Sequence, residues 1–138
     1  MGVEIKGLEG VLERLEGIAG KNISDQIEQA CLLVERTARQ TAPKIDGALR
    51  RSIATKVDGT TGTVFSNLFY APYVEYGTGL FSIHPMGGRK DVPWVYFDEK
   101  NKQYITTYGQ HAKPFMRPAL DENRDRIVEI LKEGFKNG

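Results

Sequence analysis

The sequence contains a single cysteine, Cys31, and this scarcity limits what the chain can build. One thiol can form neither an intrachain disulfide nor a zinc site made of several cysteines. Cys31 falls on the apolar stripe of an expected helix. We therefore interpret it as a small buried hydrophobic side chain rather than a reactive thiol.

Long apolar runs and an excess of one charge are also missing. No apolar run approaches ~20 residues, so no membrane-spanning helix is predicted. The opening residues, Met1–Lys6, lack the apolar stretch of a secretory signal. The 19 basic and 18 acidic side chains leave a net charge of +1, whereas a protein that binds nucleic acid through phosphates usually has a clear basic excess. Neither a membrane nor nucleic acid is expected as a main partner.

Histidine is scarce, which weakens the case for catalysis. His84 and His111 are the two histidines and fall in different expected loops. A metal site would need carboxylates from unlinked positions such as Asp91 or Asp98, and no serine or cysteine stands in a nucleophile motif. The sequence predicts no catalytic residues, cofactor or metal. A small hydrolase using Glu75 or His111 stays open as an alternative.

A local group of basic residues lies near the end of the second expected helix. We interpret it as a solvated face, or as a group paired with Glu28, Glu35 or Glu75. A nucleic-acid-binding module that uses these arginines is a further alternative. The group comprises Arg36, Arg39, Lys44, Arg50 and Arg51.

Helical periodicity is clear in three places. Apolar residues at helical spacing predict a helix over residues 8–19, and a second over residues 25–41 with Ser24 as its N-cap. Pro43 ends the second helix. The last helix is expected from about residue 117 to residue 135. The expected core positions are Ile27, Ala30, Cys31, Val34 and Ala38 in the second helix, and Leu120, Ile127, Ile130, Leu131 and Phe135 in the last.

Strand patterns predict two hairpins, one over residues 54–67 and one over residues 94–107. Between them, Pro72 begins a short helix that ends at Gly77. The glycines and prolines of residues 79–93 predict a flexible loop. The chain is therefore expected to be one α+β domain over residues 1–138. Its antiparallel sheet of about four strands packs with two or three helices, including the C-terminal one.

Two stretches are the most informative, Tyr70–Thr78 and Lys113–Leu120. They combine turn-forming residues, aromatic side chains and single charges, a composition that suits fixed geometry and partner contact. Phe115 is expected to lock the start of the last helix onto the core. Glu75 is unfavourable near a helix C-terminus, so we expect it to pair with Arg117 or Arg50.

These stretches, with Ala42-Pro43 and Gly47–Ile53, resemble the tail-component family of long-tailed bacteriophages. The family includes tail completion, head–tail joining and minor tail proteins. The pattern covers nearly the whole chain, although Asp46 stands where the family often has threonine. The residues that carry it are Gly47, Leu49, Arg50, Tyr70, Tyr73, Glu75, Gly77, Thr78, Pro114, Phe115, Arg117 and Pro118.

The resemblance implies a non-enzymatic virion assembly protein of a phage or prophage. Such a protein forms a ring, often a hexamer, at the neck or tail end, and contacts copies of itself, the connector and tail-tube proteins. Its place is the virion, after assembly in the bacterial cytoplasm. The clustered tyrosine, phenylalanine and tryptophan side chains are expected to supply part of the subunit contact.

Overall fold

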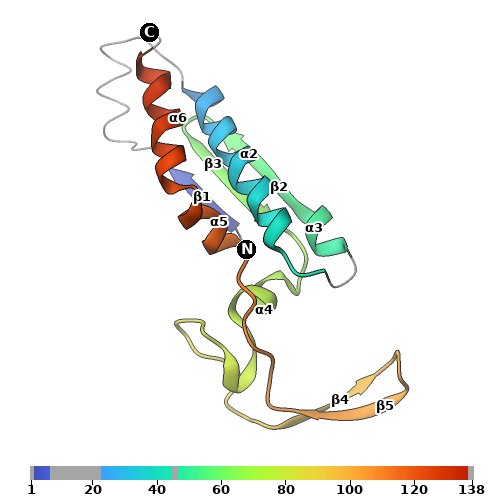
Figure 1. Ribbon diagram of the computed structural model, residues 1–138. Helices are drawn as coiled ribbons and strands as arrows, with labels where there is room; N and C mark the ends of the chain where they lie inside the picture. Colours follow the sequence, from blue (N-terminus) through green and yellow to red (C-terminus); the bar gives the residue numbers. More distant parts are fainter. Residues whose placement is uncertain (1, 7–22, 45–46, 137–138) are drawn as a thin grey trace. The chain divides into compact units, whose positions relative to one another are not determined.

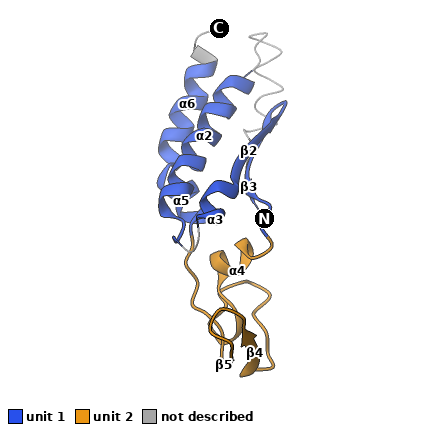
Figure 2. Cartoon of the chain, turned by 90° about the vertical axis from the view of Figure 1, so that its right-hand side faces the viewer, with its two compact units in different colours: residues 1–68, 115–138 blue, residues 69–114 orange. Residues whose placement is uncertain are grey.

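The computed structural model describes residues 2–6, 23–44 and 47–136, with the side chains of residues 3–6 and 135–136 excepted. The chain divides into two compact units (Figure 2). Unit 1 consists of Met1–Leu68 and Phe115–Gly138, and unit 2 consists of Phe69–Pro114. The single-domain prediction is not confirmed by this division. The helix predicted over residues 8–19 lies outside the described residues.

Unit 1 contains a three-stranded antiparallel sheet in the order β1-β3-β2. The strands are β1 (Gly2–Lys6), β2 (Ile53–Asp58) and β3 (Thr61–Ser66). The predicted first hairpin is confirmed as β2 and β3, with Val57 opposite Gly62. Strand β1 was not predicted, and it pairs with the other edge of β3, with Val3 opposite Val64.

Helix α2 (Ser24–Thr41) covers the sheet, and its apolar stripe is the centre of the core (Figure 1). Each predicted core position of this helix is fully buried, which confirms the helical period. The helix ends before Pro43, with Ala42 in an extended conformation. The N-cap prediction was wrong, because Ile23 holds that position and the Ser24 hydroxyl donates to the Gly59 carbonyl at 3.0 Å.

Gly62, the second residue of β3, lets α2 approach the sheet closely. A Cβ at this position would meet Cys31 Sγ, and it would lie 2.7 Å from Ile27 Cγ2. Helix α3 (Ala48–Ser52) follows the turn at Gly47 and buries Leu49. Ile53 is also fully buried and begins β2.

The C-terminal segment forms two helices, where one was predicted. They are α5 (Met116–Glu122) and α6 (Arg124–Lys136), with the break at Asn123. The Asn123 amide donates to Thr37 Oγ1 at 2.9 Å and to the Ala119 carbonyl at 2.8 Å. This link to α2 through a side chain fixes the position of the break.

Most of the predicted inner face of the last helix is confirmed. Ile127, Ile130 and Leu131 are buried, whereas Leu120 is only half-buried and Met116 and Ala119 take the core positions of α5. The break at Asn123 separates α5 from α6, so the buried side of α5 does not continue the spacing of the buried side of α6. The Phe135 side chain lies outside the described part of the chain.

Unit 2 contains the predicted short helix and second hairpin. The elements are α4 (Ala71–Tyr76), the 3-10 turn η1 (Gly79–Phe81), β4 (Trp94–Asp98) and β5 (Gln103–Thr107). Strands β4 and β5 form a two-stranded antiparallel sheet. Flexibility of residues 79–93 stays a prediction, although residues 79–81 adopt a regular turn.

Main-chain hydrogen bonds join the outgoing and returning segments of unit 2. The Thr78 N–H donates to the Gln110 carbonyl at 2.9 Å, and the Leu80 N–H donates to the Tyr108 carbonyl at 2.8 Å. The Lys113 N–H donates to the Val74 carbonyl at 2.8 Å. These bonds tie the start of unit 2 to its end.

The described chain is therefore α+β with antiparallel sheets, as predicted. No described helix combines the length and apolar composition needed to cross a membrane.

Candidate functional site

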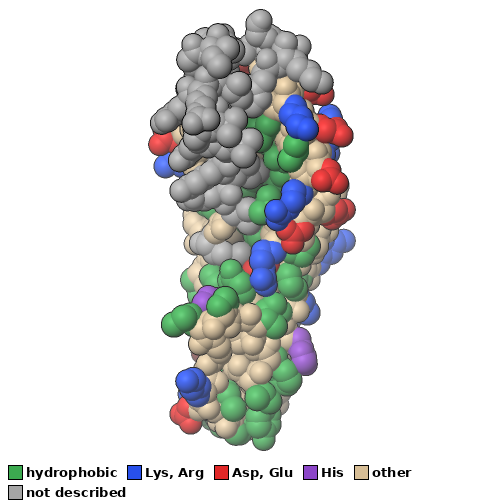
Figure 3. Space-filling view, turned by 90° about the vertical axis from the view of Figure 1, so that its left-hand side faces the viewer, with side chains coloured by type: hydrophobic (Ala, Val, Ile, Leu, Met, Phe, Trp, Pro, Cys, Tyr) green, Lys and Arg blue, Asp and Glu red, His purple; other side chains and the backbone are tan. Residues whose placement is uncertain are grey.

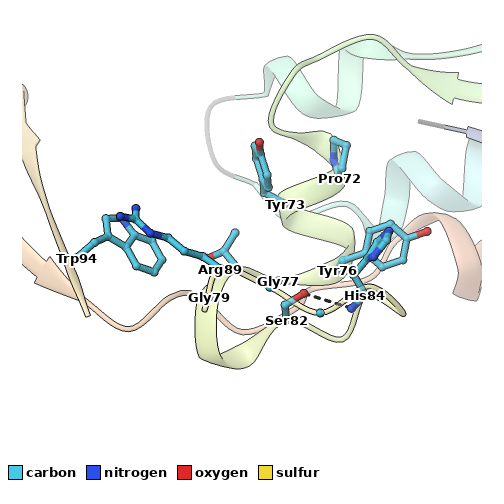
Figure 4. Close-up of a pocket in the computed structure, with 12 residues that line it drawn as sticks. Pro72, Tyr73, Tyr76, Gly77, Gly79, Ser82, His84, Arg89 and Trp94 are labelled. Atoms are coloured by element: carbon cyan, nitrogen blue, oxygen red, sulfur yellow. Dashed lines mark hydrogen bonds between the residues drawn. The ribbon is translucent and has the colours of Figure 1, made fainter. Parts of the chain in front are cut away.

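Helix α4 lines a pocket of about 610 Å³ that is formed within unit 2. Pro72 lies in the first turn of the helix, where its missing N–H costs nothing, and Gly77 ends the helix with a φ of 77°. Tyr73 and Tyr76 project from α4 into the wall of the pocket (Figure 4). The sequence motif at residues 70–78 thus builds one side of this pocket.

Ring contacts order the remaining side chains of the pocket. Tyr76 meets His84 edge to face, with ring centroids 4.7 Å apart. The Arg89 guanidinium lies 4.8 Å from the centre of the Trp94 ring, a cation–π contact. Figure 4 shows these two pairs on separate sides of the pocket. Such a surface suits an apolar or aromatic group from a partner.

The polar groups of the pocket are used in local structure. The His84 Nδ1 accepts a hydrogen bond from the Met86 N–H at 3.0 Å, and Ser82 Oγ accepts one from the His84 N–H at 3.2 Å. Ser82 is thus bonded to the His84 main chain rather than to its imidazole. This is not the geometry of a nucleophile and its base.

Two positions of the pocket require glycine because the main chain of residues 108–112 passes close to them. Gly77 has a φ of 77° and Gly79 a φ of 59°. A Cβ on Gly77 would lie 2.8 Å from Ala112 N, and one on Gly79 would meet the Tyr108 carbonyl oxygen. A side chain at either position would push the two segments of unit 2 apart.

The hairpin of β4 and β5 exposes large hydrophobic side chains on both of its faces. Val95, Phe97 and Tyr104 share one face and are 60%, 41% and 77% exposed. Tyr96 is on the opposite face and is 44% exposed. The rings of Phe97 and Tyr104 pack at 5.1 Å across the strands. The predicted exposure of aromatic side chains is confirmed, while their role in a subunit contact stays a prediction.

Hydrophobic side chains gather over the β4–β5 hairpin of unit 2 in the space-filling view (Figure 3). The hairpin is a two-stranded sheet, and within the described residues neither outer edge pairs with a further strand. Open edges and exposed aromatic rings together are typical of a surface that another chain covers.

Asp98, one of the carboxylates considered for a metal site, holds the hairpin turn. It accepts hydrogen bonds from the Asn101 side chain at 2.8 Å and from the Lys100 N–H at 3.0 Å. The side-chain bond from Asn101 is the main reason that the pKa of Asp98 is below its usual value, and main-chain bonds from Asn101 and Lys100 add to this effect. The carboxylate is therefore ionised and engaged in the turn.

The two candidates for catalysis, Glu75 and His111, lie in different environments. Glu75 is fully buried and has an interaction partner. The predicted pairing with Arg117 or Arg50 stays a prediction. His111 is exposed and its ring stacks on Phe81 at 4.0 Å. Across the described residues, no three histidine, cysteine, aspartate or glutamate side chains gather in a way that would hold a metal ion.

The structure places the remaining motif residues in both units. In unit 1, Gly47 has a φ of 81° before α3, and Leu49 and Phe115 are fully buried. Tyr73 is 57% exposed and Arg117 is also exposed, whereas Tyr70, Thr78, Pro114 and Pro118 are half-buried. The motif therefore mixes core residues with surface residues. Its role in assembly is taken up below as a proposal.

Sequence reasoning assigned no role at the pocket to His84, Arg89 or Trp94. They come from the loop at 79–93 and the start of β4, and only the fold brings them beside α4. The one signal in the sequence is the aromatic content of residues 94–97, which by itself indicates only a strand of the hairpin.

The predicted basic group is gathered by the fold. Arg36 and Arg39 from α2 meet Arg50 and Arg51 from α3 around a hollow of about 430 Å³. The expected pairing with Glu35 is confirmed for Arg39, with 3.9 Å between Nη2 and Oε2. Lys44 does not line the hollow.

Cys31 is fully buried against the sheet, as predicted. Burial, with help from the nearby Glu28 and Glu35 carboxylates, raises the pKa of the thiol to about 11. The thiol is neutral at physiological pH, which favours the structural interpretation.

The chain was compared with protein families, curated proteins and solved structures. Residues 6–77, just over half of the chain, match the family described as "Bacteriophage HK97-gp10, putative tail-component". No curated protein and no solved structure matches the chain. The matched region includes α2, the first hairpin and α4, while the stretch at 113–120 lies beyond it. The chain therefore belongs to the HK97-gp10-like family of bacteriophage tail components.

Proposed function

We propose that this protein is a structural assembly protein that forms a ring at the head–tail neck or tail end of a long-tailed phage or prophage. It acts in tail completion or head–tail joining, without catalysis. Its partners are copies of itself, with a hexamer as the expected ring, and the connector and tail-tube proteins. It is made in the bacterial cytoplasm and ends in the virion. Membership of a tail-component family supports this assignment.

The exposed hairpin of β4 and β5 is the observation that carries the proposal. A two-stranded hairpin is marginal by itself in water, and this one leaves Val95, Phe97 and Tyr104 exposed on one face. Covering these side chains in a subunit contact removes apolar surface from water, at about 25 cal/mol per Å². The hairpin is therefore the best candidate for one contact of the ring.

A ring needs a second, different surface on each subunit, because head-to-tail contacts are heterologous. We assign this surface to the exposed side of α2, where Leu32 is 46% exposed although the helix is otherwise polar on that side. The hairpin of one copy would contact α2 of the next. The pocket beside α4 is available to a side chain of the connector or tail tube.

The test is the oligomeric state of the purified protein, measured by light scattering across a range of concentrations. The wild type is expected to form oligomers of one size as concentration rises. Replacing both Phe97 and Tyr104 with serine removes two exposed rings from the proposed contact. We expect the dissociation constant of the oligomer to rise at least about tenfold, with little change in melting temperature.

Val128→Ser is the matched control, because Val128 is also exposed (43%) but lies on α6. It should leave oligomer formation unchanged. Wild-type protein that stays monomeric at every concentration, and forms no ring when electron microscopy is carried out on mixtures with phage tails, would overturn the proposal.

A further inference from the structure

The hollow between α2 and α3 in unit 1 is a concentrated positive site. Its lining consists of Glu35, Arg36, Arg39, Gln40, Arg50 and Arg51. Residues 35, 36, 39 and 40 of α2 fall on one side of the helix by its 3.6-residue period. The chain then turns back at Pro43 and Gly47, which brings Arg50 and Arg51 of α3 to the same place.

Main-chain carbonyls hold two of the four guanidinium groups in position. Arg39 Nη2 donates to the Ile53 carbonyl at 2.7 Å, and Arg50 Nε donates to the Ala42 carbonyl at 3.1 Å. A carbonyl fixes the orientation of an arginine without cancelling its charge. These two groups are thus ordered before any ligand arrives, which lowers the entropy cost of binding.

The positive charge of the hollow is only partly balanced. Glu35 is the acidic residue of the lining, and it already contacts Arg39 at 3.9 Å and accepts from Thr55 Oγ1 at 3.2 Å. Within the described part of the chain, Arg36, Arg50 and Arg51 form no ion pair. By contrast, Arg124 and Arg126 on α6 pair with Asp121 and Glu129 at 2.8 and 3.0 Å.

The form of the hollow favours a compact anion over a nucleic-acid backbone. Duplex DNA carries a charge every ~1.7 Å and is bound along an extended basic surface. Here the arginines surround one hollow, Glu35 forms part of its wall, and the whole chain has a net charge of +1. The planar fork of arginine matches a carboxylate, which it binds through two parallel hydrogen bonds.

We infer that this hollow binds the carboxylates of an acidic segment on a protein partner. Arg36 and Arg51 would bind the carboxylates of the partner directly. Arg39 and Arg50, held by main-chain carbonyls, would add fixed positive charge beside them. This site belongs to unit 1, whereas the exposed hairpin belongs to unit 2. Arg36 follows Leu32 by one turn of α2, so the site adjoins the second ring surface proposed above, and its test therefore measures peptide binding rather than ring formation.

A labelled peptide of consecutive glutamates tests the inference by fluorescence anisotropy at low salt. The full-length protein should bind the peptide, and the affinity should fall as salt rises. The double variant Arg36→Gln and Arg51→Gln should bind at least about tenfold more weakly, because it loses the two charged groups that hydrogen-bond to the peptide carboxylates. Both side chains are exposed, so the melting temperature should be unchanged.

The matched control removes the same charge elsewhere, with Arg124→Gln and Arg126→Gln on α6. This variant should keep the wild-type affinity. A second variant, Arg36→Lys and Arg51→Lys, keeps the charge but loses the fork, and it should bind more weakly than the wild type.

Three results would overturn the inference. They are no binding of the peptide by the wild type, an equal loss in the α6 control, and wild-type affinity in the lysine variant. Tighter binding of a short DNA duplex than of the peptide, lost in the Arg36 and Arg51 variant, would assign the hollow to nucleic acid instead.

Discussion

Units 1 and 2 use their hydrophobic residues in opposite ways. Unit 1 encloses Phe115, Met116, Leu49 and Ile53 completely. Its exposed large hydrophobic side chains, among those described, are Leu32 and Val128. The exposed set of unit 2 is far larger, and comprises Phe69, Tyr73, Leu80, Ile83, Met86, Val95, Tyr96, Phe97, Tyr104 and Tyr108.

The two units are therefore stabilised by different interactions. Burial of apolar surface stabilises unit 1. Unit 2 has little buried apolar surface, with Ala71 as its one fully buried hydrophobic residue among those described. It depends on main-chain hydrogen bonds between residues 74–80 and 108–113, and on glycines that allow these segments to approach. The comparison indicates that buried apolar residues stabilise mainly unit 1, and the exposed side chains of unit 2 are consistent with the contact surface that we propose for it.

The largest expected effect is the loss of Phe115 from the core of unit 1. Phe115→Ala leaves a cavity at a fully buried position, and should lower the free energy of unfolding by about 3–5 kcal/mol. Phe97→Ala is the control in unit 2, where the ring is 41% exposed, and should cost under about 1 kcal/mol. Urea unfolding of both variants measures the difference. Equal losses would break the proposed contrast between the units.

A second prediction concerns the glycine packing of unit 2. Gly79→Ala places a Cβ against the Tyr108 carbonyl and 2.7 Å from Trp94 Cζ3, at a φ of 59°. It should destabilise unit 2 by about 2–3 kcal/mol. Hydrogen exchange should show faster amide exchange within residues 78–110, with protection of α2 unchanged.

Gly87→Ala is the matched control for this effect. Gly87 has a φ of 77° but nothing within 4 Å of the added Cβ, so the substitution should cost only about 1 kcal/mol. If both variants lose protection to the same degree, the close approach at Gly79 is not what holds unit 2 together.

The smallest expected effect is a pH dependence from the buried thiol of unit 1. The folded pKa of Cys31 is raised to about 11 from a usual value of 9.0, so the fold favours the neutral thiol. This contribution is fully present below pH 9.0 and is lost as pH rises toward 11. The loss of stability should reach about 1.4 kcal/mol near pH 10, the middle of that interval.

The measurement is the stability difference between the wild type and Cys31→Ala as a function of pH. The difference should shrink above pH 9.0, because only the wild-type unfolded chain gains the thiolate. A constant difference up to pH 11 would show that Cys31 is more accessible than its burial in unit 1 indicates.

Local patterns were sufficient to predict much of this fold. Three features depend only on residues that are close together in the sequence. They are the apolar period of α2, the two hairpins with turns at Gly59 and residues 99–102, and the short helix from Pro72 to Gly77. The features missed depend on distant contacts. The break at Asn123 is fixed by Thr37, and β1 forms by pairing with β3.

The candidate sites were likewise predicted only in part. The Tyr70–Thr78 stretch was identified as a surface for partners, and it lines the pocket of unit 2. Arg89 and Trp94 were not assigned to it, because their place beside α4 depends on the path of a long loop. The basic group was identified from sequence, but its convergence on one hollow requires the turn between α2 and α3.

The hydrogen bonds from Lys113 to Val74 and from Thr78 to Gln110 join the first and last segments of unit 2. Residues 80–108 therefore form an insertion whose two ends are held together, whereas the core of unit 1 is encoded by the sequence on either side of unit 2. A substitution or insertion within residues 80–108 would therefore leave the buried residues of the unit 1 core unchanged, and under our proposal it would alter the surface offered to a partner.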